Sequence, residues 1–127
     1  MRQSNNILRR ILLVDDDIDH LRLFTLVLEG GGYSVDAYND PDTALLQFRP
    51  DYYDIAILDY LMPHLGGLEL YGRIRELDSG IRCSILTATH EKLTDHEDNP
   101  PRREDLMVIR KPIDNEELLM KIDSILN

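Results

Sequence analysis

The chain of 127 residues has the length of one domain that can bury a substantial core. Its composition, 43% hydrophobic and 30% charged residues, is that of an ordinary soluble globular protein. The formal net charge of −10 argues against direct binding of nucleic acid, because such binding needs clustered Lys and Arg, and the two Arg-Arg pairs stand isolated.

Membrane insertion and secretion are also disfavoured. No apolar run reaches the length of a membrane span, and the opening stretch MRQSNNILRR lacks the apolar segment of a signal peptide. The single cysteine, Cys83, excludes an internal disulfide and fits a reducing compartment. We therefore expect a cytoplasmic protein in which Cys83 is a buried, unreactive thiol.

Short apolar runs recur at a steady interval along the chain and predict β-strands. Most of them are continuous rather than alternating, the pattern of strands that are buried on both faces of a parallel sheet. The second run in chain order alternates more and suits an outer strand. The runs are ILLV (11–14), YSVDAY (33–38), DIAILD (54–59), CSILTA (83–88) and LMVIR (106–110).

Between these runs lie segments whose apolar residues recur at helical spacing. The first, from about Ile18 to Leu28, ends at the glycines of EGGG (29–32). The second begins with Asp40 as its N-terminal cap and Pro41 at the first helical position. The predicted buried stripes are Leu23, Phe24, Val27 and Leu28, then Leu70, Ile74 and Leu77, and, in a last helix capped by Asp114, Leu118, Ile122 and Ile125.

One segment departs from this alternation of predicted strands and helices. The segment HEKLTDHEDNPPRRED (90–105) stands where a fourth helix belongs, but it has few apolar residues and contains Pro100 and Pro101, which stop a helix. We expect a short or distorted fourth helix and a mobile loop there. The alternation of strands and helices, with no linker or repeat, predicts one α/β domain over 1–127 (core about 8–126) built on a doubly wound, five-stranded parallel sheet.

Charged and polar side chains stand at the carboxyl ends of four predicted strands. Asp15–Asp17 follow the first strand and Asp59 ends the third. Thr87 stands in the fourth and Lys111 follows the fifth. Each alone has an ordinary explanation, such as turn chemistry for an aspartate. Because ligands bind outside the carboxyl ends of an open parallel sheet, their shared position favours a binding site.

Such a group of carboxylates needs a positive partner. At an effective dielectric of 20, two carboxylates about 5 Å apart repel by roughly 3 kcal/mol. Oxygen-rich anionic sites suit Mg²⁺, which takes one or two protein carboxylates and keeps several waters. We therefore expect a magnesium ion and Lys111 to share the site.

Four motifs, taken together, carry a resemblance to a known family. They are ILLVDDD (11–17), AILDYLMPHLGGLEL (56–70), ILTAT (85–89) and VIRKP (108–112). With them the sequence resembles, over essentially its whole length, the receiver domain of two-component response regulators. The resemblance implies a flavodoxin-like fold with strand order 2-1-3-4-5 and helices on both faces of the sheet.

The resemblance also implies a phosphoacceptor and a metal site. Asp59 looks like the aspartate that takes a phosphoryl group from a histidine kinase. Asp15 and Asp16 look like the acidic pair that holds Mg²⁺ together with Asp59, and the backbone carbonyl of Leu61 looks like a further ligand. A carboxylate is a competent nucleophile for an acyl phosphate. Phosphoryl transfer then depends mostly on positioning and charge neutralisation.

Three more residues receive roles in the same way. Thr87 looks like the hydroxyl that follows the phosphoryl group on activation, and Lys111 like the ammonium that contacts the phosphoryl oxygens. Asp17 is expected to cap a helix rather than bind metal. Val108 departs from the family, which usually places Tyr or Phe there as a rotameric switch. That departure and segment 90–105 put signal output through the fourth helix and fifth strand in doubt, but not the phosphorylation chemistry.

Other interpretations compete with this one. A haloacid-dehalogenase-like phosphohydrolase could use Asp15 and Asp17, but that family expects Thr or Val where Asp19 stands, and a second acidic pair downstream. A calcium loop would need Gly and Glu at the positions of His20 and Leu26, so it fails. A receiver-like module that binds partners without phosphorylation remains the main alternative.

The sequence thus predicts a stand-alone receiver without an output domain, a link of a phosphorelay or related pathway and not a dedicated enzyme. It would be phosphorylated by a histidine kinase or histidine phosphotransfer protein, catalyse its own phosphorylation and dephosphorylation, and signal to an unknown downstream protein by contact. Leu21 and Leu26 fall off the predicted stripe and are candidates for the kinase-docking face. We expect a monomer, before and after phosphorylation.

Overall fold

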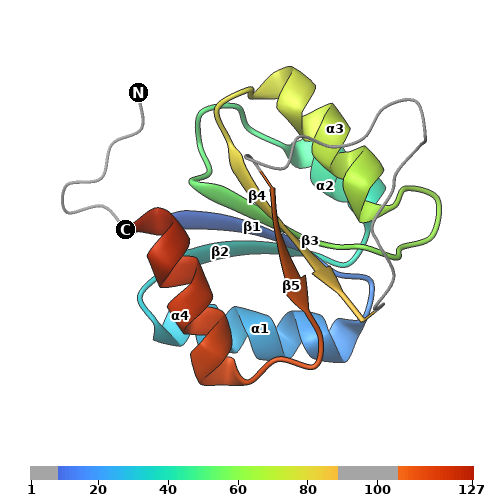
Figure 1. Cartoon of the computed structure of the whole chain (residues 1–127). Coiled ribbons are helices and arrows are strands. Elements are labelled where there is room, and N and C mark those ends of the chain that lie inside the picture. The colour runs from blue at the N-terminus through green and yellow to red at the C-terminus, as the bar shows by residue number, and fades with distance from the viewer. Residues whose placement is uncertain (1–8, 89–105) are drawn as a thin grey trace.

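The computed structural model describes residues 9–88 and 106–127. Within these ranges, parallel strands form one sheet in the predicted order, β2-β1-β3-β4-β5 (Figure 1). Segment 90–105, with its expected short fourth helix, lies outside the described residues, so the label α4 belongs to the last helix of the chain. The elements are β1 (Arg10–Val14), α1 (Ile18–Gly30), β2 (Ser34–Tyr38), α2 (Pro41–Gln47), β3 (Ile55–Asp59), α3 (Gly67–Leu77), β4 (Arg82–Thr87), β5 (Leu106–Arg110) and α4 (Asn115–Leu126).

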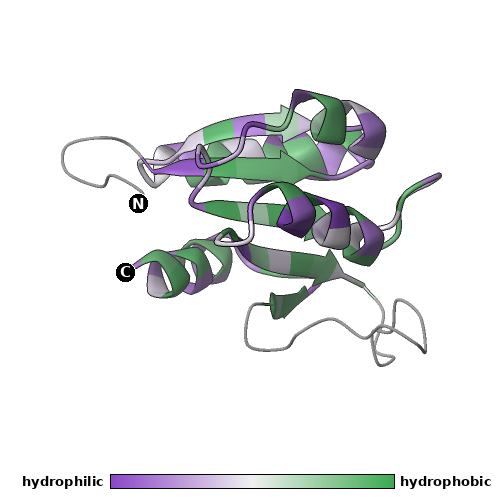
Figure 2. Ribbon diagram, turned by 90° about the horizontal axis from the view of Figure 1, so that it is seen from above, coloured by the Kyte–Doolittle hydropathy of each residue, from purple (hydrophilic) through white to green (hydrophobic). Residues whose placement is uncertain are grey.

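Helices cover both faces of the sheet, α1 and α4 on one side and α2 and α3 on the other (Figure 1). Because successive side chains of a strand point to opposite faces, β1 supplies both layers. Leu12 and Val14 enter the apolar cluster under α2 and α3, and Ile11 and Leu13 enter the cluster under α1 and α4. This explains why β1 and β3 read as continuous apolar runs, and why Figure 2 shows the strands mainly in the colour of hydrophobic residues.

The helix starts follow the predicted capping in two of three places. Asp17 caps α1, where its Oδ1 accepts hydrogen bonds from the backbone N–H of Asp19 (3.0 Å) and His20 (3.2 Å). Asp40 caps α2 in the same way and is followed by Pro41 at the first helical position. Asp114 stands at the start of α4 but makes no capping hydrogen bond through its side chain.

Two details of the predicted buried faces are wrong. In α1, Leu21 is buried and Leu23 is 44% exposed, the reverse of the prediction. Apolar residues occur around more than one face of this helix, so spacing alone did not fix which face meets the sheet and α4. Leu21 is therefore a core residue and no candidate for a docking face, whereas Leu26 is exposed as expected.

In α3, the predicted third member of the stripe, Leu77, is half exposed because the helix ends there. The next residue, Asp78, is buried instead. Its carboxylate accepts hydrogen bonds from the backbone N–H of Asp51 (3.0 Å) and Gly80 (3.2 Å), which replace the water it loses.

The expectation for Cys83 is confirmed. Cys83 is a buried free thiol whose pKa is raised by burial, which makes it unreactive. None of the helices in residues 9–88 and 106–127 combines the length and the apolar character that crossing a membrane requires.

Candidate functional site

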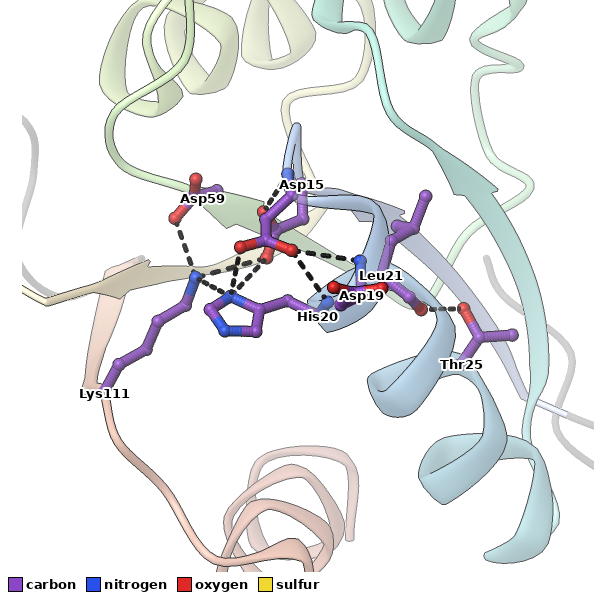
Figure 3. A network of polar contacts seen from close by, with 8 residues as sticks. Asp15, Asp19, His20, Leu21, Thr25, Asp59 and Lys111 are labelled. Carbon is purple, nitrogen blue, oxygen red and sulfur yellow. Dashed lines mark hydrogen bonds and ion pairs between the residues drawn. The ribbon is translucent and has the colours of Figure 1, made fainter.

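Three of the predicted site residues, Asp15, Asp59 and Lys111, meet at the carboxyl ends of the strands (Figure 3). Asp15 follows β1 directly and Asp59 is the last residue of β3, and these two strands are paired side by side. Lys111 follows β5, with its backbone N–H bonded to the carbonyl of Thr87 at 2.7 Å. The parallel sheet thus brings together groups that lie about a hundred residues apart in the sequence.

The acidic part of the site consists of three carboxylates. Asp15, Asp16 and Asp59 each offer an oxygen that lies within 4.8 Å of the other two. Asp15 is completely buried, Asp59 is nearly so and Asp16 is exposed. Asp17 turns away from this group to cap α1, as predicted. An all-oxygen donor set with one solvent-facing member fits Mg²⁺, which prefers carboxylates and keeps several waters.

Lys111 provides the positive charge at the site. Its Nζ donates to Oδ2 of Asp15 and to Oδ1 of Asp59, at 3.2 Å in each case. The side chain is only 11% exposed, so this ammonium is held between the two carboxylates rather than solvated at the surface. A lysine that precedes a proline would normally be read as a surface residue, but here the fold directs it inward.

The surroundings of Asp59 change its pKa. Its pKa is raised to about 7, first by burial and second by the negative charge of Asp15, while Lys111 pulls in the opposite direction. One lysine therefore does not offset the cost of ionising Asp59 in this place. A dication at the cluster would favour the ionised carboxylate and return the pKa toward its usual range.

The turn after β3 places Asp59 at the rim of the sheet. The backbone N–H of Tyr60 donates to the carbonyl of Leu86 (2.8 Å), and that of Gly67 donates to the carbonyl of Tyr60 (2.9 Å). A Cβ atom on Gly67 would come within 2.3 Å of the carbonyl oxygen of Asp59, so only glycine allows this approach of α3. Leu61, in the same turn, has an exposed side chain.

Thr87 and Val108 occupy the neighbouring strands. The register pairs Asp59 with Leu86, so Thr87 comes one step further along β4, at the same edge as the acidic cluster. Thr87 is buried. Val108 pairs with Ile85 in β5 and is partly exposed. Thr87 thus lies at the edge of the sheet that carries the acidic cluster, and the roles of Thr87 and Val108 in signalling stay predictions.

One residue of the site was missed by the sequence interpretation. His20, in the first turn of α1, has its Nδ1 3.1 Å from Nζ of Lys111 (Figure 3). The same nitrogen lies 3.9 Å from Oδ2 of Asp15 and 3.6 Å from Oδ2 of Asp17. Its spacing from Asp17, one helical turn, was the available signal, because a side chain one turn after the cap faces the same end of the helix.

Comparison with known proteins matches residues 11–123 to the family model of the response regulator receiver domain. The chain belongs to this receiver family. The response regulator receiver protein CpdR of Brucella abortus is 28% identical over 94% of this chain and 98% of its own length. The response regulator ArlR of Staphylococcus aureus is 35% identical over 92% of this chain, which spans about half of ArlR.

Solved receiver structures share the fold. In a complex of the histidine kinase ThkA with the response regulator TrrA, one chain matches with a TM-score of 0.77 and 30% identity, over 94% of this chain and 100% of that one. TrrA of Thermotoga maritima, solved in complex with Mg²⁺ and BeF, gives a TM-score of 0.74 and 29% identity over the same shares. The chain is accordingly a receiver of two-component signalling, a class of signalling domain rather than a dedicated enzyme.

Proposed function

We propose that this receiver accepts a phosphoryl group on Asp59 and signals by protein contact. An ionised oxygen of Asp59 attacks phosphorus, a new O–P bond forms, and the bond from phosphorus to the donor breaks. The donor is the phosphorylated histidine of a kinase or phosphotransfer protein, whose nitrogen leaves with the electron pair. Water later hydrolyses the acyl phosphate, so the domain catalyses both its own phosphorylation and its own dephosphorylation.

One observation carries this proposal: a nearly buried aspartate lies beside two further carboxylates and 3.2 Å from a lysine ammonium. This arrangement has no evident benefit for folding, because burial and Asp15 together push the pKa of Asp59 to about 7. It does suit phosphoryl transfer, which needs a positioned nucleophile and positive charge around the transferred group.

Mg²⁺ belongs to the proposal as the cofactor. Asp15, Asp16 and Asp59 would hold it, together with the backbone carbonyl of Leu61. When bound, it neutralises charge on the phosphoryl oxygens and orients the donor. The residues of the chain do the rest. Asp59 supplies the nucleophilic oxygen, and the ammonium of Lys111 faces the position where phosphoryl oxygens arrive.

The signalling part of the proposal concerns Thr87 and Val108. The hydroxyl of Thr87 would follow the phosphoryl group and report its presence to the neighbouring loops. Because Val108 has no ring to couple to that movement, we propose that output avoids the usual surface of the fourth helix and fifth strand. The protein then stays monomeric after phosphorylation, and its state is read near α1 and the loops at the strand ends.

The partners follow from the same scheme. The solved complex of TrrA with a histidine kinase supports a histidine kinase, or a histidine phosphotransfer protein, as phosphodonor for this chain. The free thiol of Cys83 supports a cytoplasmic location, where thiols stay reduced. The downstream partner is a protein that recognises the phosphorylated state by contact.

The direct experiment is intact-mass measurement after incubation with acetyl phosphate and Mg²⁺. Wild-type protein should gain the mass of one phosphoryl group, and Asp59→Asn should gain none. Asp19→Asn is the matched control, because Asp19 is an exposed aspartate close to the site that makes no contact with Lys111. It should be labelled as the wild type is.

Two results would count against the proposal. Full labelling of Asp59→Asn would move the acceptor to another residue. A wild-type protein that takes up no phosphoryl group from acetyl phosphate or from a histidine kinase would favour the alternative of a receiver-like module that binds its partners without phosphorylation.

A further inference from the structure

His20 contacts the site but has no part in the chemistry proposed above. Its Nδ1 lies 3.1 Å from Nζ of Lys111 (Figure 3). A lysine ammonium has donors only, so Nδ1 must accept this hydrogen bond, and the neutral ring then carries its proton on Nε2. The contact therefore fixes both the tautomer of the imidazole and one direction of the ammonium.

The three N–H groups of Lys111 have three acceptors, which are Oδ2 of Asp15, Oδ1 of Asp59 and Nδ1 of His20. The first two belong to the proposed magnesium ligands, so a metal ion or a phosphoryl group competes with Lys111 for them. Among the described residues, His20 is the acceptor of Lys111 that lies outside this ligand set. It can keep its hydrogen bond to Lys111 while the carboxylates are engaged elsewhere.

Two further contacts hold His20, one at its ring and one at its backbone. Its ring packs on the buried ring of Phe24, one turn later in α1, with centroids 5.7 Å apart and planes tilted by 34°. Its backbone N–H is bonded to the capping carboxylate of Asp17. The ring of Phe24 also lies under the ammonium, 6.0 Å from Nζ of Lys111, where the negative face of an aromatic ring attracts a cation.

We propose that His20 is a positioning residue for Lys111. It keeps the ammonium aimed at the acceptor oxygen of Asp59 during phosphoryl transfer, while the carboxylates that also hold Lys111 are drawn to the metal and the phosphoryl group. This inference rests on the proposed role of Asp59, but the His20–Lys111 contact can be tested without phosphorylation. The side chain of His20 is 44% exposed, so it can be replaced with little loss of core packing.

Two substitutions distinguish the role of the Nδ1 acceptor of His20 from the role of its aromatic ring. His20→Phe keeps an aromatic ring on Phe24 but removes the acceptor. His20→Asn loses the ring but places an amide oxygen close to the position of Nδ1. At saturating Mg²⁺ and acetyl phosphate, the rate of phosphoryl uptake should fall roughly tenfold in His20→Phe and stay within about twofold of wild type in His20→Asn, as expected for loss and rescue of a partner that orients a site residue. The Mg²⁺ affinity should be unchanged in both.

The second measurement is the ¹⁵N NMR spectrum of the His20 ring in unphosphorylated protein without metal. The spectrum should show the Nε2–H tautomer with a hydrogen-bonded Nδ1, and Lys111→Met should shift the Nδ1 signal. Unchanged ring signals in Lys111→Met would overturn the contact, whatever the phosphorylation result.

The rate of phosphoryl uptake by the His20 variants can overturn the inference independently of the NMR spectrum. An unchanged rate in His20→Phe, or equal losses in His20→Phe and His20→Asn, would show that the nitrogen does not position Lys111. If wild-type protein takes up no phosphoryl group, the proposed function fails, and with it the part of His20 in phosphoryl transfer. The NMR arm then still decides whether His20 holds Lys111.

Discussion

The polar groups at the two ends of the sheet differ in the partners that they have. Toward the amino ends, Tyr53 precedes β3 and donates its hydroxyl to Oδ2 of Asp36, in the middle of β2, at 2.8 Å. Nearby, the guanidinium groups of Arg10 and Arg49 lie over the ring of Tyr52, 4.3 and 3.8 Å from its centroid. Each of these three charged groups thus has a hydroxyl or an aromatic ring as a partner.

At the carboxyl ends of the strands, by contrast, groups of like charge lie close together. Asp15 and Asp59 are buried side by side with Asp16 near them, and one ammonium serves both buried carboxylates. The same chain that pairs its polar groups at one end leaves an excess of negative charge at the other. This difference indicates that the acidic end is built for a positive ligand and for a reaction, since folding alone would favour the arrangement at the amino end.

The largest expected effect comes from removing the cation of the acidic end. Lys111→Met leaves the buried carboxylate of Asp15 without its ammonium, so the free energy of unfolding in metal-free buffer should fall by about 3 kcal/mol. Urea denaturation measures this. Mg²⁺ should restore part of the loss, because it supplies positive charge to the same oxygens.

The matched control is Lys121→Met, on the exposed face of α4, which should change stability by less than about 0.5 kcal/mol. If the two lysine variants were equally stable, the ammonium of Lys111 would not be balancing a buried charge.

The next effect is a pH dependence of stability that comes from Asp59. An acid whose pKa is higher in the folded state stabilises the fold while it is protonated. That contribution is fully present below the unfolded value of about 4 and is lost as the pH rises through the folded value of about 7. Between about pH 5 and about pH 8, metal-free wild type should therefore lose on the order of 2 kcal/mol more than Asp59→Asn does.

Denaturation curves of both proteins across this range measure the difference. Saturating Mg²⁺ should flatten the wild-type profile by favouring the ionised carboxylate. Parallel profiles of the two proteins without metal would show that Asp59 titrates as an ordinary exposed aspartate.

The smallest effect concerns the amino end. Tyr53→Phe removes a hydrogen bond to the half-buried carboxylate of Asp36 and should cost about 1 kcal/mol, as for a typical hydrogen bond of this kind. This cost should be the same with and without Mg²⁺. A cost that depends on the metal would mean that the two ends of the sheet are not independent.

Most of the fold and the positions of the site residues could be predicted from the sequence, because the end of an apolar run marks the end of a buried strand. The continuous apolar run of β3 stops at Asp59, and that of β1 stops at Asp15, so the sheet topology alone brings both aspartates to one edge. Lys111 could be placed for the same reason, because β5 directs it to this edge.

The features that could not be predicted depend on how a helix is rotated about its own axis and on which distant groups a side chain contacts in the folded chain. Periodicity did not decide whether Leu21 or Leu23 faces the sheet, since both lie in an apolar helix and packing against α4 makes the choice. His20 was missed because its contact with Lys111 joins the first turn of α1 to the residue after β5, which lie 91 residues apart in the sequence. Asp78 is buried for the same kind of reason, through backbone groups that only the folded chain brings to it.

The most direct test of the contrast between the two ends is a titration of metal-free protein with Mg²⁺, followed by backbone amide NMR. We expect saturable shifts confined to Asp15–Asp17, to Asp59–Leu61 and to Lys111, with no change at Asp36 or Tyr53. Shifts spread evenly over the acidic surface, or concentrated at the amino ends of the strands, would contradict this expectation.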